Sequence, residues 1–246
     1  MFWCRTSRDA LSASGRDAAS YLQSQLSQDL RPMAVGASAW SFVLTPTGKV
    51  EALVRVRRVG DDEYLLDTDE GRGAHLLARL LRFRIRVDVD VVATTLDVVA
   101  VRGEGMPPTP ADALVAWGSG FDLVAGTASA AEICAVVPQG DADDLLAARI
   151  ESCWPAAAEL VPGETVPAET GVVDVAVSFT KGCYPGQELV ERMDSRGSSA
   201  PWRLATIDVA PGTLVGDPVV RDGVDVGVVT SALGTRAIAR LRRSAG

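Results

Sequence analysis

The pattern of hydrophobic and polar positions changes several times along the first hundred residues of the chain. Apolar side chains recur with helical spacing across residues 14–30, and leucine pairs do so across residues 70–83. Residues 38–67 and 85–103 instead alternate between apolar and polar side chains, as strands do. Such strand–strand–helix–strand units predict mixed sheets with helices packed on one face.

The remainder of the chain again mixes strand and helix patterns, and its last part has strand patterns only. Residues 121–126 and 132–138 are predicted to be short strands, and residues 141–152 a helix with aspartates in its first turn. Beyond residue 198 we expect only strands, with a hairpin turn at Asp222-Gly223, in a small antiparallel barrel or sandwich. The predicted fold class is therefore α+β. Its expected units are residues 1–103 (α+β), 104–197 (α+β) and 198–246 (β-barrel-like).

Composition and charge restrict the partners. Of the 246 residues, 47% are hydrophobic and 23% charged, which is typical of a folded chain with a sizeable core. The net charge of −8 argues against direct contact with nucleic acid or an anionic membrane. The sequence has no run of ~18 apolar residues, and its first residues lack the apolar stretch of a signal peptide. We therefore expect a cytoplasmic protein with no membrane partner, and we also expect a monomer.

Cysteine and histidine usage excludes several kinds of site. The four cysteines are far apart in sequence, so no C-x-x-C metal or redox pair exists. The one histidine, His75, lies in a predicted helix, which rules out a multi-histidine metal centre. A surface or half-buried role for His75 is favoured over a catalytic pair with a cysteine or serine.

One stretch of residues 178–197, "SFTKGCYPGQELVERMDSRG", concentrates unusual chemistry. An extended segment over residues 171–179 is predicted to turn at Pro185-Gly186 into a short helix. Cys183 then lies just ahead of a helix N-terminus and two residues from Lys181, and both features favour the reactive thiolate. The residues alone leave a second reading open, namely a tight structural turn whose cysteine merely fills space.

Residues 181–188, K-G-C-Y-P-G-Q-E, resemble the signature of the YgfZ family of folate-binding proteins that support iron–sulfur enzymes. The similarity continues in residues 15–30, 45–56, 148–155 and 227–241. A wider relation connects that family to the T-protein of the glycine cleavage system, an aminomethyltransferase that uses tetrahydrofolate. The resemblance thus implies a three-part, clover-like arrangement around a central folate pocket.

The resemblance also implies functional residues. It makes Cys183 and Lys181 the catalytic pair, with tetrahydrofolate or a one-carbon derivative as cofactor. Glu151, within an R-I-E match to the T-protein, would contact the pterin, since a carboxylate accepts two hydrogen bonds; a solvated glutamate near a helix end is the alternative. The other residues expected at the cofactor are Tyr184, Gln187 and Glu188, with Arg192, Arg196 and Arg203 for the folate glutamate tail.

The implied function is folate-dependent help with assembly or repair of iron–sulfur clusters in client enzymes, including tRNA-modifying ones. Partners would be iron–sulfur assembly proteins and clients. Cys183 would be the essential thiol and a transient cluster ligand, because one cysteine cannot hold a stable cluster alone. Two alternatives are an aminomethyl or other one-carbon transferase, and a non-catalytic folate-binding scaffold. Glu51 and Ala52 stand where the T-protein carries paired aspartates, which argues against aminomethyl transfer.

Overall fold

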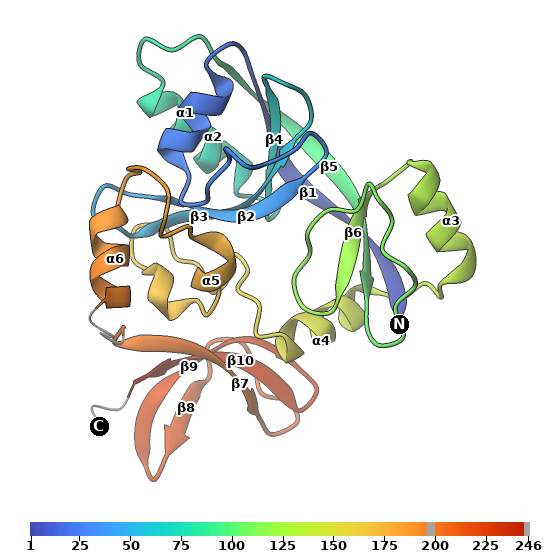
Figure 1. Ribbon diagram of the computed structural model, residues 1–246. Helices are drawn as coiled ribbons and strands as arrows, with labels where there is room; N and C mark the ends of the chain where they lie inside the picture. Colours follow the sequence, from blue (N-terminus) through green and yellow to red (C-terminus); the bar gives the residue numbers. More distant parts are fainter. Residues whose placement is uncertain (196–199, 244–246) are drawn as a thin grey trace.

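The computed structural model describes residues 1–195 and 200–243, and within these ranges its strands form two sheets. The first is a half-barrel of six strands in the order β2-β3-β4-β1-β5-β6 (Figure 1). All neighbouring strands in both sheets are antiparallel, so the prediction of mixed sheets is wrong. The strands of the first sheet are β1 (Phe2–Ser14), β2 (Ser38–Leu44), β3 (Val50–Arg58), β4 (Glu63–Thr68), β5 (Asp90–Arg102) and β6 (Gly120–Val124).

Strand β1 is the element that the sequence pattern missed. It pairs with β5 along its whole length, from Phe2 opposite Arg102 to Ser14 opposite Asp90. Within residues 85–103, where the alternating pattern predicts strands, the structure has this one strand β5. Strand β6 continues the same sheet by pairing with β5, so the sheet crosses the expected unit boundary after residue 103.

Both faces of the first sheet are covered. Helices α1 (Ala18–Gln25) and α2 (Gly73–Phe83) pack on one face, over a core that includes Val43. The opposite face packs Phe42 and Leu44 against α5 (Val173–Ala176) and α6 (Gln187–Ser195). Strand β2 is therefore buried on both sides, which explains its nearly continuous apolar run.

The second sheet lies at the opposite end of the molecule from α1 and α2 (Figure 1). Its strands β7 (Trp202–Asp208), β8 (Pro218–Arg221), β9 (Val224–Leu233) and β10 (Arg236–Arg242) run in the order β7-β10-β9-β8. The two edge strands line one cavity of about 370 Å³, so the sheet curls. They do not pair with each other in the described residues, so the structure there is an open sheet rather than the barrel we expected. The predicted hairpin turn is confirmed, with positive φ at Asp222 and Gly223.

Between β6 of the first sheet and β7 of the second, the chain forms helices rather than strands. Helix α4 (Ala142–Glu151) was predicted correctly and begins with a capping box formed by Asp141 and Asp144. Helix α3 (Ala128–Val136) occupies a segment predicted as a strand. Thr127 caps it by accepting a hydrogen bond from the Ala130 N–H at 3.2 Å.

The segment that leads to Cys183 also differs from the expectation. Residues 171–179 were predicted to be extended, but they contain the single-turn helix α5, which follows a 3₁₀ turn at Pro167–Glu169. Figure 1 shows α4, α5 and α6 between the two sheets. Among the described residues, no helix is long and apolar enough to cross a membrane.

Candidate functional site

Lys181 anchors the segment that carries Cys183. The Lys181 side chain is buried, and its Nζ donates hydrogen bonds to the carbonyls of Gln23 (2.6 Å), Leu26 and Gln28 (3.1 Å). These carbonyls lie at the C-terminal end of α1, where helix carbonyls lack partners and a cation is favoured. Burial lowers the pKa of Lys181 to about 8, against a smaller opposing effect of Asp29. The lysine therefore joins the Cys183 segment to the first sheet's helical layer.

Gly186 fixes the other end of the same segment. It has a φ of +83°, and an added Cβ would lie 2.7 Å from both Gly48 Cα and the Thr45 carbonyl oxygen. The turn between β2 and β3 thus lies in direct contact with the backbone just before α6. Gly48 faces Leu189 in turn and also has a positive φ, +82°. Only glycine at both positions permits this approach.

Cys183 lies between these two anchors and is the exposed cysteine of the four. Cys4 is buried, while Cys134 and Cys153 are partly buried. Burial raises the pKa of each of these three thiols. The chain thus presents one thiol to solvent on a backbone held at both ends. No group of three or more His, Cys, Asp or Glu residues in the described ranges is arranged to hold a metal ion.

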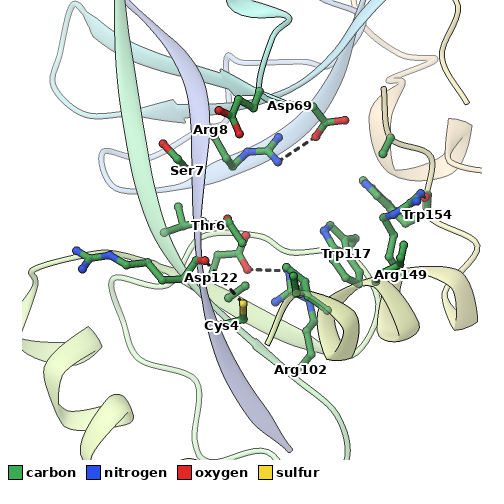
Figure 2. Close-up of a pocket in the computed structure, with 18 residues that line it drawn as sticks. Cys4, Thr6, Ser7, Arg8, Asp69, Arg102, Trp117, Asp122, Arg149 and Trp154 are labelled. Carbon is green, nitrogen blue, oxygen red and sulfur yellow. Dashed lines mark hydrogen bonds and ion pairs between the residues drawn. The ribbon is translucent and has the colours of Figure 1, made fainter. Parts of the chain in front are cut away.

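A separate pocket of about 400 Å³ lies between β1, β5 and α4 (Figure 2). This volume is within the ~300–1,000 Å³ range of small-molecule sites. Figure 2 shows Trp117, Trp154 and Arg149 grouped on one wall, with the Arg8–Asp69 ion pair above them in this view. Two indole rings and flanking charged groups suit a flat heteroaromatic ligand with polar edges.

A buried ion network includes two residues that line this pocket, Asp122 and Arg102. Arg55 is fully buried and binds Asp67 through Nε (2.9 Å) and Asp122 through NH1 (2.5 Å). Asp122 also pairs with Arg102 at 2.7 Å, and the Arg102 guanidinium lies 4.2 Å from the ring centroid of Trp117. Burial alone would raise the pKa of Asp122, but Arg55 and Arg102 together lower it below its usual value. These charges hold the pocket wall in one geometry.

The predicted cofactor residues lie elsewhere. The exposed Glu151 carboxylate binds Arg236, with its two oxygens 2.9 and 3.1 Å from the guanidinium. Glu188 and Arg192 pair with each other on α6, and Arg203 is exposed on β7. Tyr184 is buried in the core, and Gln187 donates to Glu191. None of these six side chains lines the 400 Å³ pocket, and Arg196 lies outside the described residues.

Sequence reasoning missed the residues that do line the pocket. Arg8 and Cys4 come from the unpredicted strand β1, and Asp122 comes from β6. Arg149 is the exception that carried a signal, since it belongs to the same R-I-E segment as Glu151. The structure turns the arginine of that segment toward the pocket and the glutamate toward the second sheet.

Comparisons with known proteins place this geometry in context. No family model matches the chain. An uncharacterized protein of Haemophilus influenzae is 27% identical over 197 residues, covering 79% of this chain and 69% of that protein. The mitochondrial iron–sulfur cluster assembly factor IBA57 homolog of Mycosarcoma maydis is 26% identical over 212 residues. That match covers 77% of this chain and 53% of the Mycosarcoma protein, so the chain spans about half the length of this relative.

The chain is thus a distant homologue of an IBA57-type protein. The relationship expected from the K-G-C-Y-P-G-Q-E motif agrees with this match. The fold itself matches the glycine cleavage system aminomethyltransferase T from Bartonella henselae, with a TM-score of 0.76. That match covers 98% of this chain and 78% of the transferase at 14% identity, and it establishes a shared fold. The family signature thus sits on a T-protein-like scaffold.

Proposed function

We propose that this protein binds a reduced folate and assists the assembly or repair of iron–sulfur clusters in client enzymes, including tRNA-modifying ones. The single observation that carries the proposal is the exposed thiol of Cys183, held at both ends within the family motif. The relative named as an iron–sulfur cluster assembly factor supports the same reading. In this proposal Cys183 contributes one thiolate ligand to a cluster that a partner protein also holds, because a single cysteine is too few ligands.

Lys181 acts in this proposal as a positioning residue. Its ammonium is buried against three carbonyls of the α1 end, whereas the Cys183 thiol is exposed. It therefore fixes the path of the backbone that presents the thiol. A held thiol loses less conformational entropy when it binds a cluster carried by a partner than a thiol on a loose loop would.

The pocket between β1, β5 and α4 fits a reduced folate. Trp117 and Trp154 offer flat apolar surfaces for a pterin ring, and Arg8 and Arg149 offer donors for its oxygens and for carboxylates. Asp69 supplies an acceptor for ring N–H groups. A bound tetrahydrofolate would supply one-carbon or redox chemistry. The residues of this chain would bind it, orient it and shield it from water.

The structure favours the assembly role over aminomethyl transfer. Glu51, the nearest equivalent of the T-protein's acid in the sequence, is held by His75 with Oε2 2.5 Å from Nε2. It does not line the pocket, so it is not placed to act on a ligand there. The second alternative, a scaffold in which folate is structural, differs from our proposal in leaving Cys183 without a role.

The test is complementation of a cell that lacks its own family member, with the activity of an iron–sulfur enzyme as readout. Wild type should restore activity, and Cys183→Ser should not. Cys134→Ser, which changes a partly buried cysteine, is the matched control and should restore activity fully. Anaerobic purification with a partner, followed by iron and sulfide analysis, should show that cluster retention depends on Cys183. Full complementation by Cys183→Ser would instead support the scaffold.

A further inference from the structure

The last three residues of α4 each contact a different strand of the second sheet. Arg149 NH2 donates to the Ser231 hydroxyl on β9. The Ile150 carbonyl accepts a hydrogen bond from Thr206 on β7 at 2.6 Å. Glu151 binds Arg236 on β10. The R-I-E segment is therefore the joint between helix α4, which lines the pocket, and the second sheet.

Arg149 is the member of this joint that also lines the pocket. Its NH1 donates to the Trp154 carbonyl and to Glu159 Oε2, both at 3.0 Å. Ser231 donates to the other oxygen of Glu159 at 2.7 Å, which closes a ring of three side chains. The Glu159 side chain is completely buried, and Ser231 is buried as well. A buried carboxylate and a hydroxyl from a distant strand thus set the orientation of one guanidinium.

This arrangement leaves Arg149 with unused donors. A guanidinium carries five N–H donors in a fixed planar fork. Among the described residues, the hydrogen bonds of Arg149 use three of them: two from NH1 and one from NH2. The side chain is 15% exposed and lies beside Trp154 in the pocket wall (Figure 2). The remaining N–H groups are therefore available to an oxygen acceptor on a ligand stacked against the tryptophans.

We infer that Arg149 orients the ligand of the pocket between β1, β5 and α4, and that Glu159 and Ser231 are the residues that position Arg149. This inference rests on the proposed folate site and deepens it, because it makes the second sheet a structural part of that site. Arg149 donates to a carbonyl or carboxylate oxygen of the reduced folate. Glu151 faces away and serves the joint alone.

Calorimetric titration with 5-formyltetrahydrofolate, an air-stable reduced folate, tests the inference on the full chain. Arg149→Lys keeps the charge that Glu159 requires but loses the planar fork. It should weaken binding by at least about tenfold, the effect of losing a hydrogen bond to a charged donor. Ser231→Ala should weaken binding by about two- to tenfold, because the guanidinium must then be ordered when the ligand binds. Ser231→Thr keeps the hydroxyl and should recover most of the affinity.

Two further variants separate this role from a merely structural one. Arg236→Ala removes an arginine from the same joint but outside the pocket, and it should bind within about twofold of wild type, since exposed ion pairs contribute little. Glu151→Ala should likewise have little effect, whereas the family resemblance assigns the pterin contact to that glutamate. Thermal unfolding of each variant shows that the chain is folded during the titration.

The outcomes are distinguishable. Failure of the wild-type protein to bind the folate would overturn the proposed folate site and this inference with it. Wild-type binding that Arg149→Lys and Ser231→Ala leave unchanged would overturn the inference alone. So would a loss of affinity confined to Glu151→Ala.

Discussion

At the scale of single residues, the four cysteines differ in exposure. Cys183 is exposed, whereas burial raises the pKa of Cys4, Cys134 and Cys153 above the ordinary value. Because the thiolate is the reacting form, burial makes these three thiols both less accessible and less ionised than an ordinary cysteine. Reactivity should therefore be concentrated at one position.

We predict that iodoacetamide modifies Cys183 first. In a time course at pH 7.5, peptide mapping by mass spectrometry should show Cys183 alkylated at least about ten times faster than any other cysteine. In the Cys183→Ser variant, the fast phase should disappear while the slow modification of the others stays unchanged. Faster labelling of Cys4 or Cys134 in the native protein would show that the motif does not present its thiol as the structure indicates.

Lys181 gives a second prediction at this scale, on the pH dependence of stability. Its pKa is about 8 in the folded protein and about 10.5 in the unfolded chain. Between these values the unfolded state binds more protons, so the free energy of unfolding should rise with pH. This contribution should amount to at most about 1.4 kcal/mol per pH unit. Lys181→Met should lack it.

Urea unfolding at pH 8.0, 9.0 and 9.8 measures this difference. The window ends below pH 10 because burial raises the pKa of Tyr21 and Tyr184 to about 12, and ionisation of unfolded tyrosine lowers stability above pH 10. Subtracting the variant's curve from that of wild type cancels the groups the two proteins share. A difference that stays flat across the window would show that Lys181 keeps an ordinary pKa in the fold.

At the scale of elements, the contact between the β2–β3 turn and the start of α6 depends on glycine. Gly186→Ala would place a methyl group 2.7 Å from Gly48 Cα and from the Thr45 carbonyl, in a backbone with φ of +83°. We expect a loss of roughly 1–3 kcal/mol in the free energy of unfolding. We also expect weaker support of iron–sulfur enzymes, because the anchor of Cys183 moves.

Gly182→Ala is the matched control for this prediction. It lies in the same segment, but an added Cβ there meets no atom within 4 Å, and its φ is outside the left-handed region. Its free energy of unfolding should stay within about 0.5 kcal/mol of wild type. Equal effects of the two substitutions, measured by urea unfolding, would show that the glycine-to-glycine contact is not what holds the segment.

The helices and strands also show how much of the fold the local sequence pattern can predict. Helices α2 and α4, the start of α6 and the Asp222-Gly223 turn follow from periodicity and turn chemistry within a few residues. Strand β1 could not be found in this way, because its pairing with residues 90–102 is set by partners about ninety positions away. Helix α3 was misread because its apolar run is ambiguous, although Thr127 did offer a capping signal.

At the scale of the whole molecule, the exposed thiol could be predicted and the pocket could not. Cys183 and its two anchors lie within one short motif whose residue types dictate the local backbone. The pocket instead combines residues of β1, β5, β6 and α4, and a sequence alone does not show which of them meet. The R-I-E segment illustrates the limit, since the choice between Arg149 and Glu151 depends on where the second sheet packs.

The charge distribution of the whole molecule leads to the last prediction. The net charge is −8, and within the described residues Arg240 and Arg242 lie about 5 Å from the ring centroid of Trp202, a combination that could attract RNA. Arg240 is neutralised there by Glu169 at 3.0 Å. With 32 acidic against 24 basic residues, the chain offers little net positive charge to release counterions from a phosphate backbone.

We therefore predict no tight, direct binding of tRNA, so any effect on tRNA modification should pass through client iron–sulfur enzymes. A gel-shift titration of bare tRNA at about 50 and 150 mM salt should show no submicromolar complex at either concentration, since affinity that rests on phosphate contacts falls steeply with salt. A basic RNA-binding domain run in parallel confirms that the assay detects binding. A submicromolar, salt-dependent complex that Trp202→Ala abolishes would overturn the prediction and identify the Trp202 face of the second sheet as an RNA site.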